Sequence, residues 1–593
     1  MKSYISKYLL GAVALTAAGL TSCVGDLDQT PKNPTELTPD QFAKNPREYI
    51  GGALGKCYSG IAISGQGGPD KSDISGLDNG RSCWSRAIFM LNEFTTDECT
   101  WIWKDSGVFD LCTSTWSSNN ENIFGTYSRL YTHIAVCNDF IRLARNLGDY
   151  GVSTGEGENQ VSKAELDQFV LEARALRGLS YFYVLDLFGN AVDAWDNQLT
   201  GEEPPYITRT DLFNKVTADL EEVLANFKES GVYGRIGKDA VEALLAKYYL
   251  NAEVWTGTAQ WQKCWDHCVA VINRHKGGGF QGTGLAVDYL SLFCGNNDMF
   301  APGGSLKDQN EILWNIPYAY QGVVNGADGS SHNVALTQSY GGASFLILAA
   351  LSDQNTAVPG WYGMNGQWTC MHARPQFCQK FDFNGGVSPD GRTYLWLTEN
   401  DGFKMDNTDF STYKDGYVPI KFTNVKCNPD GTMPRWKDPQ TGLARVGVHD
   451  LNNPDNYGID ATATFADTDL PVIRLAEIYL TAAEAHVRGN VGNAADALAY
   501  ANAVRNRAGV NSWNAAELNE NNLLDERARE LYWENGRRTD LVRSNKFAGS
   551  RYNWSWKNNV STGAGISNHM NVFPIPTSVI NSYGSPYPQN PGY

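Results

Sequence analysis

Cys23 is the residue whose surroundings most clearly indicate a chemical reaction. It closes the segment Leu20-Thr21-Ser22-Cys23, which follows Lys2, Lys7 and a short apolar stretch. A basic start, a short apolar middle and small residues before a cysteine are typical of a signal cleaved before that cysteine, whose thiol carries lipid. The apolar stretch is about a dozen residues, short of the ~20 that span a bilayer, although an uncleaved anchor helix is the alternative. We therefore expect residues 1–22 to be removed and the mature chain to be lipid-anchored outside the cytoplasm.

The composition narrows the class of partner. Removal of residues 1–22 leaves 571 of the 593 residues, which is enough for a large core. The formal charge of −17 becomes −19 without Lys2 and Lys7, which argues against nucleic acid and against an anionic membrane surface as partners. Aromatic residues make up 12% of the chain, and this surplus of flat apolar faces suits the binding of neutral sugars.

The other cysteines do not indicate a zinc site. The eleven besides Cys23 form no CxxC pair and have no histidine at zinc-finger spacing. Cys264 and Cys268 stand four apart on a predicted helix, where a disulfide is awkward and a metal pair would lack nearby partners. We interpret the eleven as mostly buried thiols.

Two kinds of side chain could act on a sugar. Trp101 and Trp103 are spaced so that a strand would place both rings on one face, a pattern found in packing as well as in binding. Pyranose rings present apolar C–H faces to aromatic platforms, while charged groups fix their orientation. Hydrolysis would instead require two carboxylates about 5–10 Å apart across the scissile bond. Asp97 and Glu98 are adjacent and would point apart on a strand, and Glu121 has no evident partner, so no catalytic pair is predicted.

Helical patterns at both ends of the chain predict the elements that position these residues. A capping box from Ser162 to Glu165 opens a helix with an apolar face, which Gly189-Asn190 ends. Similar spacing predicts further helices over residues 213–227, 240–255, 475–482, 495–507 and 523–543. Paired helices joined by short turns predict a mainly α fold of stacked tetratricopeptide-like pairs, although no repeat of about 34 residues is visible.

A long irregular region separates the helical ends. Residues 277–469 are rich in Gly, Asn, Asp, Pro and Trp and lack a sustained helical period. This stretch is too long for one loop, so we expect a large loop-rich lobe with short strands. Residues 59–120 form a second irregular part of that binding lobe, and the helical scaffold is placed at about 40–58, 121–276 and 470–546. Binding residues concentrate on irregular segments that a rigid scaffold holds.

Several ordered motifs run through the chain. They are PVIRLAEIYLTAAEA at 471–485, AVRNRAG at 503–509, DERAREL at 525–531, EARALR at 172–177, DLFG at 186–189, FPIP at 573–576 and QNPGY at 589–593. Taken alone, their Arg and Glu residues would form ion pairs on helix surfaces. Together, the motifs resemble the SusD/RagB family of surface lipoproteins.

The resemblance implies one SusD-like domain over residues 23–593, with four tetratricopeptide-like helix pairs. It implies a lid or receptor that binds glycans beside a SusC-type TonB-dependent transporter and is not an enzyme. The acidic segment Val24-Gly25-Asp26-Leu27-Asp28 resembles the start of lipoproteins exported to the outer face of the outer membrane.

The segment Thr96–Trp103 resembles a starch-binding member of the family, in which an arc of aromatic rings cradles a curved α-glucan. The positions that the resemblance carries over are Trp101, Trp103, Tyr340 and Trp368 for the arc, and Asp78, Arg86 and Ser106 for contacts with hydroxyls. Ser106 replaces an asparagine of the family pattern, and Asn365 and Trp368 are one residue further apart than in that pattern. The implied ligands are starch or maltooligosaccharides.

A calcium site is the implied cofactor site. Asp467 and Asp469 place two hard carboxylates two residues apart, a pattern also typical of a turn or a helix cap. The resemblance implies that this pair, with Asp298, holds calcium in a structural role.

Three functions therefore compete. The first is a non-catalytic α-glucan receptor that feeds a SusC-type transporter. The second is a receptor of the same family for another glycan or a peptide, and the third, less favoured, is a surface glycoside hydrolase.

Overall fold

The computed structural model describes residues 39–65, 71–77, 80–197, 202–228, 232–318, 339–351, 362–439, 441–447, 463–583 and 587–593. Cys23 and Asp78 lie outside these ranges, so their predicted roles stay predictions. The described residues divide into two compact units, one ending at residue 53 and resuming over 143–167, the other formed by 54–142 and 168–593.

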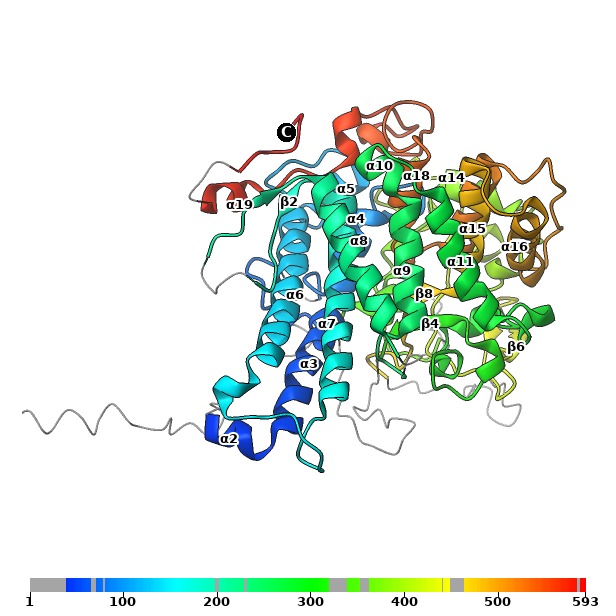
Figure 1. The fold of residues 1–593 in the computed structure, drawn as a ribbon. Helices are drawn as coiled ribbons and strands as arrows, with labels where there is room; N and C mark the ends of the chain where they lie inside the picture. Colours follow the sequence, from blue (N-terminus) through cyan, green and yellow to red (C-terminus); the bar gives the residue numbers. More distant parts are fainter. Residues whose placement is uncertain are drawn as a thin grey trace, which may run out of the picture. The chain divides into compact units, whose positions relative to one another are not determined.

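Helices dominate both the element order and Figure 1. The α-helices are α2 Pro39–Lys44, α3 Pro46–Ala62, α4 Trp84–Asn92, α5 Val108–Thr113, α6 Glu121–Arg145, α7 Lys163–Tyr183, α8 Arg209–Asn226, α9 Lys238–Leu250, α10 Ala252–Thr256, α11 Trp261–His275, α12 Gly342–Ala350, α14 Pro375–Cys378, α15 Leu475–Gly489, α16 Ala494–Arg507, α17 Glu520–Leu531, α18 Arg537–Arg543 and α19 Thr577–Ser582. The strands are β1 Thr100–Trp101, β2 Ala191–Val192, β3 Tyr206–Ile207, β4 Ile312–Ile316, β5 Met371–His372, β6 Arg435–Lys437, β7 Ala444–Val446 and β8 Leu470–Arg474. Within the described ranges, no helix is both long enough and apolar enough to cross a bilayer.

The larger unit is built on packed helix pairs, which confirms the predicted fold class. Helices α8, α9 and α11 lie side by side, and α15 packs against α9, α11, α16 and α17 (Figure 1). Almost every residue of α9 from Ala240 to Leu250 is buried, as expected for a helix surrounded by others.

The predicted start and end of the helix that follows Ser162 are confirmed. The Glu165 N–H donates to the Ser162 hydroxyl at 3.3 Å, as the capping box predicts. After Tyr183 the chain makes one π-helical turn, Val184–Phe188, and Gly189 ends it with a φ of 71°. A left-handed residue at this position favours glycine because glycine has no Cβ.

Two predicted helices are broken in the structure. The helix predicted over 240–255 is interrupted at Asn251, whose amide donates to the Lys247 carbonyl at 2.9 Å and accepts from Arg543 at 3.0 Å. The helix predicted over 523–543 is also wrong as one element, because a turn separates α17 from α18. Trp533 and Asn535 have φ values of 61° and 64° in that turn.

The strands form small antiparallel pairs, most of them with at least one strand in the predicted loop-rich lobe, whereas β2–β3 lies within the predicted helical scaffold. The pairs are β1–β5, β2–β3, β4–β8 and β6–β7. In the longest of them, β4 and β8 align Ile312 with Arg474 and Ile316 with Leu470. This pairing attaches the lobe to the start of α15, because β8 leads directly into that helix.

The charged residues of the C-terminal motifs form a buried ion network, which corrects the prediction that they form ion pairs on helix surfaces. Glu530 accepts from Arg392 at 3.1 Å, from Arg474 at 3.0 Å and from Arg507. Arg474 and Arg507 both also pair with Glu311 at 2.7 Å. All five side chains are fully buried, so they hold the lobe and the C-terminal helices together in a site closed to solvent.

The network strongly favours the ionised forms of its carboxylates. Burial alone would raise the pKa of Glu526, but the guanidinium groups of Arg392, Arg529 and Arg505 lower it to about 2. Burial opposes ionisation of Glu530 as well, and Arg507, Arg474 and Arg392 lower its pKa. A carboxylate with a lowered pKa stabilises the fold above its unfolded pKa, and this stability is lost as the pH falls through the folded value.

We expect Glu530→Gln to destabilise the larger unit by about 3–5 kcal/mol, because three buried guanidinium groups lose a shared counterion. Thermal unfolding followed by circular dichroism measures the change. The control is Asp139→Asn, which removes an exposed pair with Arg142 and should change stability by less than about 0.5 kcal/mol. Equal melting temperatures for Glu530→Gln and the control would contradict the role of the network.

In the smaller unit, Arg47 holds two segments together. Its guanidinium pairs with Glu165 at 2.7 Å and donates to the Gln160 carbonyl at 2.9 Å. The ring of Phe42 stacks on those of Tyr49 and Tyr150, with centroids 5.7 and 5.0 Å away. These contacts attach α2 and the start of α3 to the segment 147–165.

Candidate functional site

Four aromatic rings predicted to form an arc come together in the structure, and we call Trp101, Trp103, Tyr340 and Trp368 the aromatic cluster. The β1–β5 pairing aligns Trp101 with Met371, which brings Trp368 next to the Trp101 segment. Ring centroids are 5.5 Å apart for Trp101 and Trp103, 6.5 Å for Trp103 and Trp368, and 5.8 Å for Tyr340 and Trp368. Three distant parts of the chain thus supply neighbouring rings.

The four rings differ in exposure. Trp103 is 42% exposed, and Tyr340 and Trp368 are half-buried. Trp101 is only 2% exposed, because it packs against Phe94, Phe345 and the other two tryptophans. The surface available for stacking is therefore formed by Trp103, Trp368 and Tyr340, and Trp101 supports it from behind.

Arg86 also lies behind the rings. Its guanidinium carbon is 4.5 Å from the centre of the Phe345 ring and 5.4 Å from that of Trp368, and Nη1 donates to the Tyr340 carbonyl at 3.1 Å. Arg86 is 7% exposed. These cation–π contacts fix the positions of rings that come from different segments, and little of the guanidinium is left for a ligand.

The loop that carries Trp103 is held at both ends by side chains that sequence reasoning missed. The indole N–H of Trp101 donates to Asp105 Oδ2 at 2.7 Å, and Arg81 donates to the Ser106 carbonyl at 2.9 Å. The predicted polar residue Ser106 is exposed beside this anchor. Because the loop closes on itself around Trp103, that ring is presented to solvent with little freedom to move.

Trp368 is held by the end of α12. Its backbone N–H donates to the Leu348 carbonyl at 2.7 Å, and the next N–H, that of Thr369, donates to Leu351 at 3.1 Å. Thr369 has a φ of 53°, a strained value for a β-branched residue. The backbone is thus fixed directly beside the ring.

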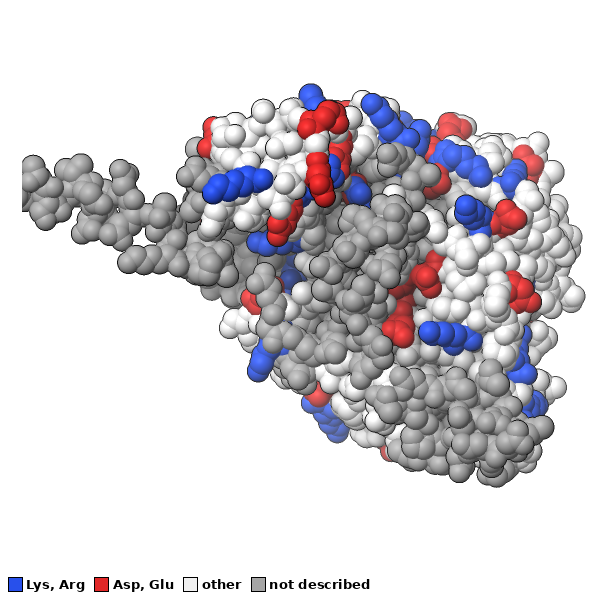
Figure 2. All heavy atoms as spheres, turned by 90° about the horizontal axis from the view of Figure 1, so that it is seen from below, with Lys and Arg blue, Asp and Glu red and all other residues white. Residues whose placement is uncertain are grey.

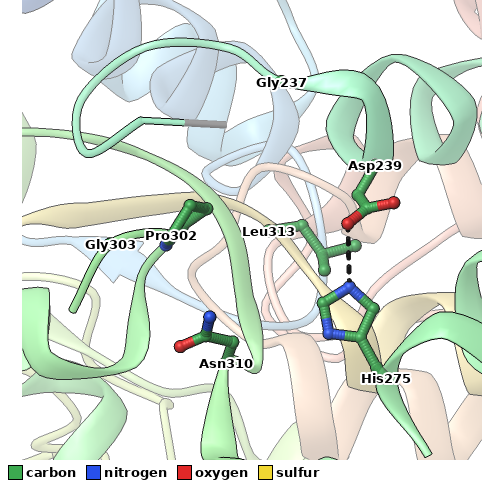
Figure 3. Close-up of a pocket in the computed structure, with 7 residues that line it drawn as sticks. All are labelled: Gly237, Asp239, His275, Pro302, Gly303, Asn310 and Leu313. Atoms are coloured by element: carbon green, nitrogen blue, oxygen red, sulfur yellow. Dashed lines mark hydrogen bonds and ion pairs between the residues drawn. The ribbon is translucent and has the colours of Figure 1, made fainter. Parts of the chain in front are cut away.

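Two cavities in the described part of the molecule lie away from the aromatic cluster. One of about 100 Å³ is lined by Gly237, Asp239, His275, Pro302, Gly303, Asn310 and Leu313, and in it His275 contacts Asp239 at 3.1 Å (Figure 3). A second of about 270 Å³ lies between the segment 380–390 and α17. Neither is lined by a residue of the aromatic cluster, and both are smaller than the roughly 300–1,000 Å³ of typical ligand pockets.

A buried carboxyl pair lies just before the cluster in sequence. The Glu98 side chain accepts from the Trp533 N–H at 3.0 Å, and Glu93 accepts from the Gly536 N–H at 2.9 Å. Both glutamates are at most 1% exposed. Burial raises the pKa of Glu93 to about 7, and burial together with the Glu93 charge raises that of Glu98. These carboxyls bind the turn between α17 and α18 and cannot reach a sugar.

Raised carboxyl pKa values make stability fall with rising pH. In the folded protein both pKa values are raised, that of Glu93 to about 7, whereas unfolded Glu loses its proton near pH 4.3, so this stability falls as the pH rises from the unfolded value through about 7. We expect Glu98→Gln, which retains an acceptor for Trp533, to lessen the loss of melting temperature between about pH 5 and pH 7. The exposed Glu253→Gln should leave the slope unchanged, and an unchanged slope in Glu98→Gln would refute the pair's role.

The three predicted calcium ligands lie around Tyr233, but within the described ranges their carboxylates do not form a group that converges on one point. Asp469 accepts from Tyr233 at 2.7 Å, from Asn315 at 2.6 Å and from the Tyr318 N–H at 2.8 Å. Burial raises the pKa of Tyr233, and the charges of Asp469, Asp298 and Asp467 raise it further. Among the residues the structure describes, no three Asp, Glu, His or Cys side chains converge on one point. Calcium held by Asp298, Asp467 and Asp469 stays a prediction.

Chelation tests this prediction directly. If calcium is structural, EDTA lowers the melting temperature, added calcium restores it, and Asp469→Asn shows no response to either. The control is Asp266→Asn, an exposed position on α11, which should respond as the wild type does. A wild-type melting temperature that EDTA does not change would remove calcium from the protein.

Comparison with known proteins gives the family. A model of the SusD family matches residues 310–593. The chain is 30% identical to the starch-binding protein SusD of Bacteroides thetaiotaomicron over 630 aligned positions, which cover all of both chains. It is 26% identical to a SusD-like protein of Bacteroides ovatus, over 71% of this chain and 66% of that one. The chain therefore belongs to the SusD family.

Solved structures share the fold. The surface glycan-binding protein A of Bacteroides thetaiotaomicron, in complex with laminarihexaose, matches 92% of this chain and 99% of its own, with a TM-score of 0.60 and 18% identity. A SusD superfamily protein from Bacteroides thetaiotaomicron matches 94% of this chain and all of its own, with a TM-score of 0.61 and 18% identity.

Proposed function

We propose that this protein is a non-catalytic receptor that binds starch or maltooligosaccharides through the aromatic cluster. The observation that carries the proposal is the position of Trp103, which is 42% exposed and whose ring centroid is 6.5 Å from that of Trp368. Neighbouring aromatic rings that are partly exposed form an apolar patch of the kind that marks a binding site, and sugar rings offer matching C–H faces.

The angles between the rings favour a curved ligand. The ring planes of Trp103 and Trp368 are tilted by 38°, and those of Trp368 and Tyr340 by 44°. A flat β-1,4-glucan ribbon presents coplanar faces and cannot lie against all three rings. A helical α-1,4-glucan turns along its length and can. The full-length relative named as starch-binding supports the same ligand, while the structural neighbour crystallised with laminarihexaose supports another glycan as the alternative.

The charge distribution agrees with a neutral ligand. On the face in Figure 2, Lys and Arg side chains lie among Asp and Glu side chains, and no broad patch of one sign is visible over the residues described. A polyanion would require such a patch. The chain's formal charge of −17 likewise disfavours nucleic acid.

The proposal extends to the setting in which the receptor works. Lipid on Cys23 would anchor it to the outer membrane, facing outside, and a SusC-type TonB-dependent transporter would receive the bound α-glucan. The lipoprotein signal before Cys23 and membership of the SusD family support this arrangement.

Isothermal titration calorimetry with maltoheptaose and a cyclic maltooligosaccharide tests the ligand. We expect Trp103→Ala and Trp368→Ala each to weaken binding by about 1–3 kcal/mol, because each removes a stacking face. Trp101→Ala combined with Trp368→Ala should weaken it further, since Trp101 supports the surface. Tyr206→Ala is the matched control, because Tyr206 is 40% exposed and lies outside the cluster.

Two outcomes would contradict the proposal. Wild-type affinity in the double variant Trp101→Ala plus Trp368→Ala would show that the aromatic cluster is not the binding site. Tighter binding of laminarihexaose than of maltoheptaose would show that the preferred ligand is another glycan. Release of reducing ends from starch by the purified protein would show catalysis and contradict the receptor role.

A further inference from the structure

The cysteines in the described part of the chain form no disulfide, and one of them differs from the rest. All eleven in the described part of the chain are buried and outside any disulfide. Ten have 0% exposure, whereas Cys427 is 7% exposed and lies between the exposed residues Lys426 and Asn428. Cys427 is thus the most exposed of these cysteines, and exposure favours reaction of a thiol with a reagent.

Cys427 has a second thiol beside it, from a distant part of the chain. Each of Cys294 and Cys427 influences the pKa of the other. Asn296 bridges the two residues: its Oδ1 accepts from Cys294 Sγ at 3.1 Å and from the Cys427 N–H at 2.8 Å, and its Nδ2 donates to the Cys427 carbonyl at 3.2 Å. The Gly295 N–H adds a bond to Val425 at 2.9 Å. Two segments far apart in sequence are therefore already aligned for a covalent link.

The two thiols also differ in acidity, as a nucleophile and its resolving partner do. A hydrogen bond from Cys294 lowers the pKa of Cys427, while burial raises that of Cys294. Two other close pairs, Cys57 with Cys137 and Cys264 with Cys268, are fully buried, and burial raises the pKa of Cys137 and of Cys268. These two pairs serve as controls within the same protein, because they bring thiols together without the exposure or the lowered pKa of Cys427.

We infer that Cys294 and Cys427 form a reactive dithiol, a modification site that small-molecule disulfides convert into an intramolecular disulfide bond. The Cys427 thiolate attacks one sulfur of the reagent, forms a mixed disulfide and releases one thiolate. Cys294 then loses its proton and attacks the Cys427 sulfur, which releases the second thiolate. One reagent disulfide is reduced to two thiols as one protein disulfide forms, so two electrons leave the protein.

The bond would stabilise the loop-rich lobe. It would join the residues before the 3-10 helix Asn297–Phe300 to the segment 420–428, which closes a loop of more than a hundred residues in the unfolded chain. None of the bonded residues belongs to the aromatic cluster. The inference is therefore independent of the proposed function.

The experiment uses the full mature chain treated with oxidised glutathione, then alkylated, digested and analysed by mass spectrometry. We expect a peptide pair linked through Cys294 and Cys427, a melting temperature above that of the reduced protein, and reversal by dithiothreitol. Cys294→Ser should stop at the glutathione adduct on Cys427, because the resolving thiol is missing. Cys427→Ser should take up no glutathione at Cys294, and Cys264→Ser should behave as the wild type does.

Three outcomes would overturn the inference. Cys427 could stay fully alkylatable after oxidation, a different pair could link first, or Cys294→Ser could remain unmodified at Cys427. Each is read directly from the peptide masses and does not depend on how well any variant binds glycan.

Discussion

The fold depends on a set of charges that have been removed from water. Glu530 on α17 is shared by Arg392 of the lobe, Arg474 at the end of β8 and Arg507 at the end of α16. Burying these ions is costly, and the cost is offset only if every partner stands at hydrogen-bonding distance. The network therefore tolerates one arrangement of the lobe against the C-terminal helices, and the attachment of a loop-rich lobe becomes as specific as that of a packed helix.

That constraint reaches the aromatic cluster through the backbone. Directly after Glu530, the chain turns at Tyr532 and Trp533, where Lys421 donates to the Tyr532 carbonyl at 2.6 Å and the Trp533 N–H donates to Glu98. Glu98 stands two residues before β1, and β1 pairs with β5, three residues beyond Trp368. These hydrogen bonds and the β1–β5 pairing thus connect the ion network to rings that lie on irregular segments. The scaffold supplies the order that local secondary structure does not provide there.

The sequence predicts the helices well because the spacing of their apolar residues is a local pattern. The prediction fails where a contact with a residue distant in sequence determines the structure. The only local signal of the break near Trp533 is Asn535-Gly536, a dipeptide typical of turns, and the acceptors that stabilise the break are the distant residues Glu93 and Glu98. The motif residues Arg474 and Glu530 have the composition of a helix surface, and only the partners Glu311 and Arg392 from the lobe make them core. The members of the aromatic cluster could be predicted from the family motifs, but the burial of Trp101 could not, because it results from Phe94 and Phe345 packing around that ring.

This packing determines which rings of the aromatic cluster are exposed and which support them. A ring that binds a sugar must keep one face in water, yet it must not rotate, since ordering it on binding would reduce the affinity. Trp101 and Arg86 are themselves buried and fill the space behind Trp368. Asp105 accepts a hydrogen bond from Trp101, which closes the loop that carries Trp103. The exposed faces are therefore ordered before any ligand arrives. In the proposed receptor, mutually tilted rings would select a ligand by its curvature, because a chain of another shape can touch only some of them.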